Sequence, residues 1–452
     1  MTISADSLFA DLQAGAAVTD LTPPRSVFLY GYPHVARDST GVNDPLQCAA
    51  LYLRGAGETG RMQGQVLFLA NDLIHVSKRF SAFVRRAITA ETGVPEEAIM
   101  ITATHTHSGP VIVDHLSNAA DATVPKADVG YLAWVAQQMV AAAQAAVKSA
   151  RPAELGLAVA RANGIGTNRH DPAGPADPEV PVLVVRACEG GAPIAAMIVY
   201  AMHPTVLHED STSISGDFPH YARRFLQARV LGAVRPVLYH NGASGNQSPR
   251  HVTRANTFAE AQRLGELLGQ AVAAALPSIT FSRKCPVSVR GTSVELTLRR
   301  MPERESALRA LTEVRARFEK LKHDGARRTA VRTAECDVFG AEETVELALA
   351  ATDGRLEAKA RECSPAEIQV VQIGPWKFVG WPGEFFVEYG LELKRRAPGT
   401  FVITLANGEL QAYIVTAEAD ARGFYEARNA LFSHENGPRV VEATLALIAR
   451  SD

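Results

Sequence analysis

The hydrophobic positions of the first hundred residues follow two patterns in succession. Val66–Leu69 and Ile99–Ile101 are continuous apolar runs, and the amphipathic segment Ser77–Thr92 between them has a helical period. Continuous runs are typical of strands that are covered on both faces, and a 3.6-residue period is typical of a helix packed on one side. The pattern therefore predicts a strand, helix, strand unit within a covered sheet.

Two further helices are marked by their ends. An Ala-rich segment with helically spaced apolar residues, beginning near Leu132, stops at Pro152, whose ring denies the next turn its hydrogen bond. A second helix is predicted over Thr257–Leu276. Thr257 with Glu260 three residues later forms a capping box at its start.

Short apolar runs predict six more strands: Val182–Val185, Ile194–Tyr200, Pro236–Tyr239, Gln369–Ile373, Lys377–Gly380 and Phe401–Leu405. Because helices alternate with strands only in part, we expect an α/β fold with a mixed β-sheet core flanked by helices. Residues 302–362 are rich in Arg, Glu and Ala, which predicts a helical excursion of two helices; a solvated charged face fits equally well. Nothing divides the chain, so residues 1–452 are expected to form one domain.

Composition and charge exclude several classes of protein. Hydrophobic residues make up 47% and charged residues 21%, which is globular usage. The 46 basic and 48 acidic residues give a net charge of −2, which argues against an electrostatic nucleic-acid binder. The five cysteines are widely spaced and form no C-x-x-C, so reduced thiols are expected.

The N-terminus and the longest apolar stretch bear on localisation. Residues 1–13 contain two Asp, no Lys or Arg and no apolar segment, unlike a secretory signal. The longest apolar stretch, Ile194–Met202, is far shorter than the roughly 20 residues that span a bilayer. We therefore expect a soluble cytoplasmic protein without stable membrane insertion.

The sharpest local signal is T-H-T-H-S-G-P over residues 104–110, directly after the predicted strand. His105 and His107 are two residues apart, so on extended chain both would point to the same side. Ligands bind at the carboxyl ends of strands in open α/β sheets, and imidazole is the commonest zinc ligand. The pair favours a metal or catalytic site over structural histidines.

Two more residues follow strands in the same way. His203 comes after Ile194–Met202, although satisfied core histidines are also common. Glu384 lies in the apolar turn W-P-G-E-F-F, where an unpartnered charge would be costly to bury. A metal or another cation would explain it, and an Arg ion pair or an N-cap role is the alternative.

Other motifs carry less information about a functional site. Four histidines in polar loops cannot be separated from surface histidines by spacing: His208, His220, His240 and His251. G-A-S-G within residues 241–249 is one residue short of the G-x-S-x-G nucleophile elbow. The metallo-β-lactamase pattern H-x-H-x-D-H fails at Gly109 and Pro110, and the H-x-H of barrel amidohydrolases lies on a first strand, whereas this one comes after about a hundred residues.

The order of motifs along most of the chain resembles the catalytic domain of the neutral/alkaline (non-lysosomal) ceramidase family, whose members are zinc-dependent amidases. The similar segments are Ala14–Pro23, Tyr30–Tyr32, Thr104–Pro110, Asn168-Arg169, His203–Thr205 with Ser215–Phe218, Ser248-Pro249, Pro382–Phe385, and Tyr413 with Tyr425 twelve residues later. One such segment would be weak evidence, but several in the same order are strong.

The resemblance implies a site and a reaction. It implies four ligands for one zinc ion: His105, His203, Glu384 and Tyr413. It also implies His107 as acid/base, with Arg169 and Tyr425 facing the scissile carbonyl. Such an enzyme would hydrolyse a linear amide bond of an N-acyl compound through a metal-bound hydroxide, and His107 would protonate the leaving amine.

Several departures from the family bear on the substrate. Val111 and Ile112 replace two glycines, Asn246 replaces an acidic residue, and His220 stands at a glycine position. The sequence ends at Asp452, without the family's immunoglobulin-like C-terminal domain. We therefore expect a single catalytic domain that acts on a smaller or more soluble N-acyl compound, with ceramide as the other possibility.

Other functions fit parts of the pattern. The same site could act as a zinc esterase or lactonase, since esters need less help from His107. A non-catalytic metal- or ligand-binding protein, or a closed structural zinc site, would keep the ligands without turnover. The acyl chain, the amine, the oligomeric state and the role of residues 302–362 are left open.

Overall fold

The computed structural model describes residues 12–56, 63–232 and 235–450. The expectation about a secretory signal falls almost entirely on residues 1–11, which lie outside the described residues. None of the five cysteines, all within the described ranges, forms a disulfide, as predicted. Among the described helices, none has the length and apolarity needed to cross a bilayer.

The larger sheet has eight strands and is mixed. In spatial order they are β13 (Val237–Asn241), β11 (Pro193–Tyr200), β10 (Glu179–Ala187), β8 (Arg151–Arg161), β1 (Gln13–Asp20), β4 (Gln47–Ala56), β5 (Gln63–Asn71) and β6 (Ile99–Ala103). The pairs β5–β6 and β11–β13 are parallel and the others are antiparallel. Strands β1 and β8 pair only at their first residues, so the sheet divides there into two halves.

A second, four-stranded sheet completes the core. Its order is β15 (Val287–Val294), β16 (Ala366–Ile373), β17 (Trp376–Gly380) and β19 (Thr400–Ile403). Leu51 and Phe68 from one half of the large sheet, Met197 from the other half, and Val371 and Phe378 from the second sheet belong to one buried apolar cluster. The core therefore has three β walls.

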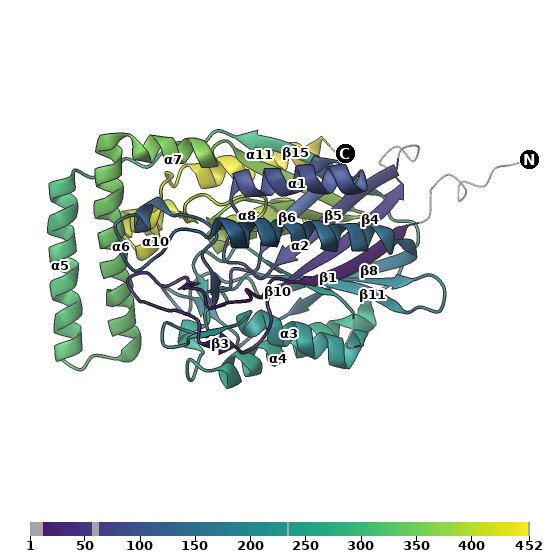
Figure 1. Cartoon of the computed structure of the whole chain (residues 1–452), viewed down its shortest axis with the longest axis horizontal. Helices are drawn as coiled ribbons and strands as arrows, with labels where there is room; N and C mark the ends of the chain where they lie inside the picture. The colour runs from purple at the N-terminus through teal and green to yellow at the C-terminus, as the bar shows by residue number, and fades with distance from the viewer. Residues whose placement is uncertain (1–11, 57–62, 233–234, 451–452) are drawn as a thin grey trace, which may run out of the picture.

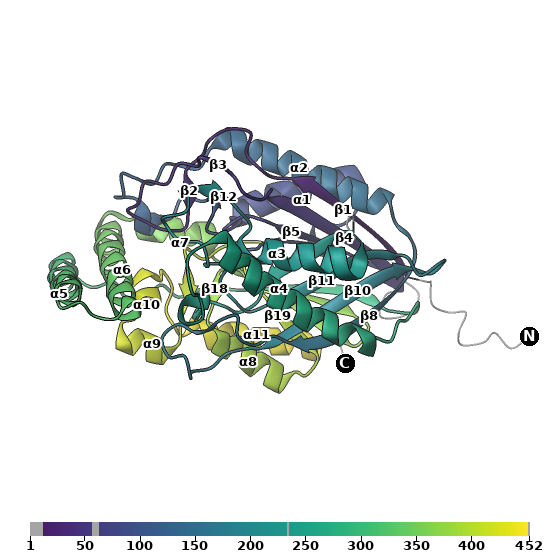
Figure 2. The ribbon, with the colours of Figure 1, turned by 90° about the horizontal axis from the view of Figure 1, so that it is seen from below.

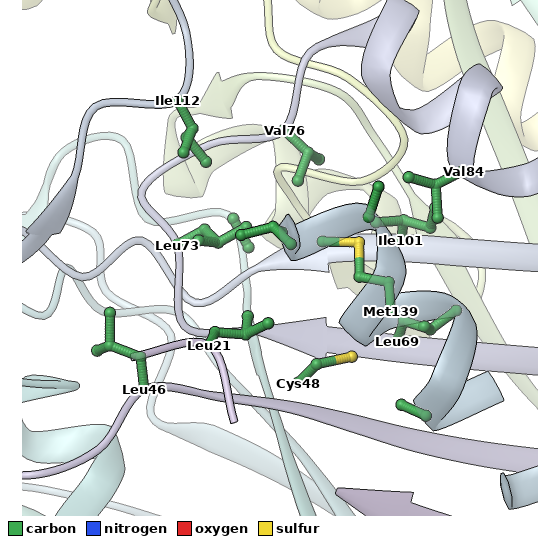
Figure 3. Packing of buried hydrophobic residues seen from close by; sticks show 14 of the residues in the cluster. Leu21, Leu46, Cys48, Leu69, Leu73, Val76, Val84, Ile101, Ile112 and Met139 are labelled. Atoms are coloured by element: carbon green, nitrogen blue, oxygen red, sulfur yellow. The ribbon is translucent and has the colours of Figure 1, made fainter. Parts of the chain in front are cut away.

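Helices cover the outer side of each wall, as the two views show (Figures 1 and 2). Helices α1 (Lys78–Thr92) and α2 (Val129–Lys148) pack on β4 to β6, where Cys48, Leu69, Ile101, Val84 and Met139 interlock (Figure 3). Helices α3 (Asp217–Leu226) and α4 (Phe258–Ala275) cover the other half, and α8 (Val387–Arg396) with α11 (Asn436–Ala449) cover the second sheet.

The remaining helices gather at one end of the molecule. They are α5 (Arg304–His323), α6 (Arg328–Asp353), α7 (Arg355–Cys363), α9 (Ala417–Arg422) and α10 (Tyr425–Asn429). Figure 1 shows α5 and α6 as an antiparallel hairpin that projects beyond the sheets. The predicted excursion is therefore helical, but it contains three helices where the sequence suggested two.

Four two-stranded ladders lie at the ends of the main strands. They pair β2 (Leu29–Tyr30) with β7 (Gly109–Pro110), β3 (Gly41–Val42) with β12 (Ser213–Ile214), β9 (Thr167–Asn168) with β14 (Gln247–Ser248), and β18 (Glu384–Phe385) with β20 (Tyr413–Ile414). These ladders join loops that are distant in sequence. The predicted α/β class and mixed core are confirmed.

Candidate metal centre

One residue from each wall of the core meets at a single point. His105 follows β6, His203 follows β11, and Glu384 follows β17 in the short strand β18. Glu384 Oε2 lies 3.2 Å from His105 Nε2 and 3.1 Å from His203 Nε2, and all three side chains are buried. The fold therefore brings together three of the four predicted metal ligands around one carboxylate oxygen.

The two imidazoles are fixed in one tautomer. His105 Nδ1 lies 2.8 Å from the Ile74 carbonyl and His203 Nδ1 lies 2.7 Å from the Ser244 carbonyl. Since a carbonyl only accepts hydrogen bonds, each Nδ1 carries a proton and each ring turns its Nε2 towards the site. Such a carbonyl partner on the second nitrogen is typical of metal-binding histidines.

The donor atoms of the group suit a cation. Burial lowers the pKa of His203 to about 4, so its ring is neutral near pH 7. Burial alone would raise the pKa of Glu384, but His105 and the other surrounding histidines hold it well below its usual range. A buried carboxylate and imidazole nitrogens thus face one another, and this donor set fits a divalent metal such as zinc. The spacing of the groups His105–His107–His203 and His75–His105–Glu384 also suits a metal.

The backbone at His105 is left-handed, with φ at 70°. His105 and His107 do lie on the same side, as predicted, but the chain between them is not extended, so the reason for the prediction was wrong. The turn brings His107 Nε2 to 3.3 Å from His105 Nε2. Such a conformation costs on the order of 1–3 kcal/mol in a residue other than glycine and is characteristic of functional sites.

His107 lies against the turn at Gly31. A Cβ on Gly31 would come within 2.5 Å of the His107 ring, and its φ of +126° also suits only glycine. The Tyr32 ring packs edge-on to His107 at 5.3 Å, and Arg37 Nη1 donates a 2.8 Å hydrogen bond to the His107 carbonyl. Burial is the main cause that lowers the pKa of His107 well below its usual value, and the neighbouring histidines lower it further.

Tyr413, Arg169 and Tyr425 also reach this region. The parallel register of β18 and β20 sets Tyr413 directly beside Glu384. The Arg169 guanidinium lies 5.3 Å from the centre of the Tyr413 ring, and Tyr425 packs edge-on to Tyr413 at 6.1 Å. Burial alone would lower the pKa of Arg169, but its ion pair with Glu426 outweighs burial and raises it.

These side chains open onto one cavity. Its lining includes His75, His105, His107, Glu384, Tyr413 and Tyr425. Arg169 lies behind Tyr413 and lines a neighbouring pocket, which shares Tyr425 with the cavity. All seven residues singled out from the sequence therefore lie in or next to one cavity.

Two histidines of the cavity were not predicted from the sequence. His75 Nε2 lies 3.2 Å from Glu384 Oε1, the carboxylate oxygen that His105 and His203 do not face. His75 follows β5 as His105 follows β6, so the same strand-end signal could have found it. His115, whose ring centroid lies 4.8 Å from that of His75, sits in an irregular loop that gives no such signal.

The remaining candidate histidines are accounted for otherwise. His240 is a core residue whose Nδ1 lies 2.8 Å from Thr102 Oγ1, and burial lowers its pKa to about 3. His220 lies 3.3 Å from Asp44, His208 stacks on Tyr32, and His251 is exposed. None of the four lines the cavity that His105 and Glu384 share.

Comparisons with known proteins agree with the predicted resemblance. Residues 12–236 match the model of the family described as neutral/alkaline non-lysosomal ceramidase, N-terminal. This chain belongs to that ceramidase family. Membership supports a hydrolase that acts on amide bonds. No curated protein matches the sequence.

Solved ceramidase structures share the fold of this ceramidase-family chain. The crystal structure of neutral ceramidase from Pseudomonas aeruginosa covers 97% of this chain and 74% of its own, with a TM-score of 0.73 and 17% identity. A structure described as a ceramidase complexed with C2 gives the same coverages, a TM-score of 0.72 and 15% identity. At these identities the likeness establishes the fold alone.

Proposed function

We propose that this protein is a zinc-dependent amidase that hydrolyses the linear amide bond of an N-acyl compound, either ceramide or a smaller relative. Family membership supports amide hydrolysis, and the His and Glu group supports a metal. The proposed zinc ligands are His105, His203, Glu384 and Tyr413. Bound zinc would polarise the amide carbonyl and lower the pKa of a water molecule towards roughly 7.

One observation carries the proposal. The Nε2 atoms of His105 and His203, with their Nδ1 protons held by backbone carbonyls, both lie within 3.2 Å of Glu384 Oε2. Two imidazole nitrogens and a carboxylate oxygen that converge on one buried point form the donor set of a divalent metal, and a cation among them would compensate the buried carboxylate. A closed structural site would have no need of the adjoining cavity or of a third imidazole, His107, 3.3 Å from one ligand.

His107 is proposed to move the proton at its Nε2. It would accept a proton from the attacking water and give it to the leaving nitrogen, since an amine leaves poorly without one. Its lowered pKa favours release of that proton. The contacts with Gly31 and Tyr32 hold the ring in place for this transfer.

Arg169 and Tyr425 are proposed to stabilise the negative charge that develops on the carbonyl oxygen. Glu426 keeps the Arg169 guanidinium charged and, with the Gly245 carbonyl 2.5 Å from Arg169 Nη2, fixes its position. The Tyr425 hydroxyl belongs to a side chain of the cavity wall, and its pKa is raised well above 10 by burial, so it stays a donor. Such preorganised donors are usually a large part of catalysis.

The His107→Ala variant tests the reaction class. Amide kcat/KM is expected to fall by about 10²–10⁴-fold, while hydrolysis of an activated ester falls much less because its leaving group needs no proton. His323→Ala, an exposed residue of α5, is the matched control and is expected to leave both rates unchanged. Equal losses on amide and ester would contradict the amidase assignment and favour an esterase.

A further inference from the structure

A second group of metal-ligand side chains lies next to the first: His75 and His115 line the cavity, and Glu409 lies 3.7 Å from His115. We propose that His75, His115 and Glu409 bind a second divalent metal ion, with Glu384 bridging the two ions. The inference rests on the proposed function in one respect, because Glu384 is shared with the first site. His75, His115 and Glu409 are not among the proposed ligands of the first ion.

Glu384 is placed to serve two ions because its oxygens face different partners. Oε2 lies 3.1–3.2 Å from His203 and His105, while Oε1 lies 3.2 Å from His75 Nε2. A carboxylate that presents one oxygen to each of two nitrogen groups has the arrangement of a bridging ligand. Two-metal hydrolytic sites place their ions about 3.5–4 Å apart, which one bridging carboxylate can span.

His115 and Glu409 extend this group away from the first site. The rings of His75 and His115 lie 4.8 Å apart with an interplanar angle of 46°. His115 Nε2 lies 3.7 Å from Glu409 Oε2, which is too long for a hydrogen bond. Two atoms that each bind one ion at about 2.0–2.2 Å are commonly separated by such a distance.

Both histidines carry buried nitrogens without a hydrogen-bond partner. These atoms are His75 Nδ1 and His115 Nε2, and the two side chains are only 4% and 6% exposed. An unsatisfied buried polar atom costs on the order of 1–3 kcal/mol, so two in adjacent rings need an explanation. An ion would bind His115 Nε2 directly, and His75 can offer either nitrogen.

Glu409 adds a buried charge to the same place. Its side chain is 5% exposed, and it accepts hydrogen bonds from the backbone and side-chain amides of Gln411, which fix its position. The Cys363 thiol lies 3.9 Å away, and burial raises the pKa of that thiol, so it remains neutral. A divalent cation between Glu384 and Glu409 would compensate both carboxylates.

The donor types define the class of ion. Two imidazoles with carboxylate oxygens suit zinc and the neighbouring divalent transition metals better than calcium or magnesium, which prefer oxygen-only sites. Zinc is therefore the probe for the second site as well as the first.

Zinc stoichiometry tests the proposal. The full chain is stripped with a chelator, reloaded with excess zinc, desalted and analysed for bound zinc per chain. The parent and the His323→Ala control are expected to hold two, and His115→Ala is expected to hold one. One zinc in the saturated parent, or two in His115→Ala, would overturn the second site and leave the proposed function intact, whereas no zinc in the parent would overturn both.

His75→Gln separates a bridging site from simple positioning of Glu384, and replaces His115→Ala should that variant fail to fold. Its side-chain amide can still donate a hydrogen bond to Glu384 Oε1 but removes the imidazole ligand. The proposal expects one zinc per chain in this variant. It also expects magnetic coupling between two Co²⁺ ions in the cobalt-loaded parent and none in the variant; an uncoupled parent would contradict the shared carboxylate.

Discussion

The two oxygens of Glu384 face two differently built halves of the site. On the strand-end side, His105 and His203 come directly after β6 and β11, and each Nδ1 is bonded to a backbone carbonyl. On the loop side, His75 and His115 pack against each other, with nitrogens that have no hydrogen-bond partner.

This difference shows two ways of arranging ligands. The strand-end histidines are preorganised by the scaffold, so their tautomer and direction are fixed before any metal binds. The loop-side histidines are buried with comparable completeness, but no described protein group forms a hydrogen bond with His75 Nδ1 or His115 Nε2. We therefore expect the strand-end side to bind metal more tightly and the loop side to be filled second.

The largest effect is expected from the residue that both halves share. Glu384→Gln removes the charge faced by three histidines, so bound zinc should fall below one per chain and amide turnover by about 10³-fold or more. Elemental analysis and kcat/KM on an N-acyl amide measure the two effects. Full zinc retention together with lost turnover would show that Glu384 is not a ligand. The two halves of the site would then share no metal ligand.

Glu343, on α6 in the wall of the cavity, is expected to make the stability of the fold depend on pH. Burial raises the pKa of Glu343 from 4.5 to about 8, although its contact with Asn429 opposes the shift. The folded state therefore holds a proton that the unfolded state loses first, so this contribution to stability is complete below pH 4.5 and is lost as pH rises through 8. At about 1.4 kcal/mol per unit, the loss is at most about 5 kcal/mol.

Glu343→Gln is expected to flatten the fall in stability across this pH window. Denaturant unfolding at pH 5 and pH 8 measures the change, with Glu305→Gln on the surface of α5 as the control. An unchanged slope in Glu343→Gln would mean that water reaches this wall, and the cavity would then not desolvate the loop side.

A buried ion pair supports the strand-end side. Asp72 accepts hydrogen bonds from both terminal nitrogens of Arg223, at 2.7 and 2.6 Å, and from Thr104 Oγ1, at 3.1 Å, next to His105. Arg223→Ala leaves the Asp72 carboxylate buried without its cation, so the free energy of unfolding should fall by about 3–5 kcal/mol. Arg79→Ala, on the exposed face of α1, should change it by less than about 0.5 kcal/mol. Equal losses of stability in the two variants would show that the Asp72–Arg223 pair does not stabilise the strand-end side.

The smallest effect is expected from Thr104, whose hydroxyl also donates a hydrogen bond to Asp72. Thr104→Val removes one hydrogen bond to Asp72 while Arg223 and the Gln47 amide remain, so a loss of about 1 kcal/mol is expected. Zinc content should not change, since His105 keeps its bond to the Ile74 carbonyl. Thermal unfolding with and without zinc measures both. Loss of zinc would show that the strand-end side is less rigid than its backbone contacts imply.

Much of the fold could be predicted because its pattern is local. The runs that became β5, β6 and β11 are continuous and apolar. The Thr257 cap of α4 accepts from the Glu260 amide, but the Glu260 carboxylate pairs with Arg263 and the Arg254 amide, so the predicted capping box is only half formed. Strands β4, β8 and β15 were not predicted. The sequence of β8 is rich in Ala, Leu and Glu, which favour helices, and its pairing with β10 overrides that preference.

The residues of the site also differ in whether a local sequence pattern could predict them. His105, His107, His203 and Glu384 could be singled out because each follows a strand, whereas Tyr413, Arg169 and Tyr425 came only from the family resemblance. Glu409 and His115 meet through two irregular loops, and the Asp72–Arg223 pair joins a strand end to α3. Contacts of this kind depend on the completed tertiary structure, which no local pattern encodes.

Anomalous diffraction at the zinc absorption edge, from crystals of the zinc-loaded protein, tests the proposed metal centre most directly. The strongest peak is expected among His105 Nε2, His203 Nε2 and Glu384 Oε2. A map without a peak at that position, or with zinc only at exposed histidines such as His323, would contradict the assignment of this site and the amidase mechanism built on it.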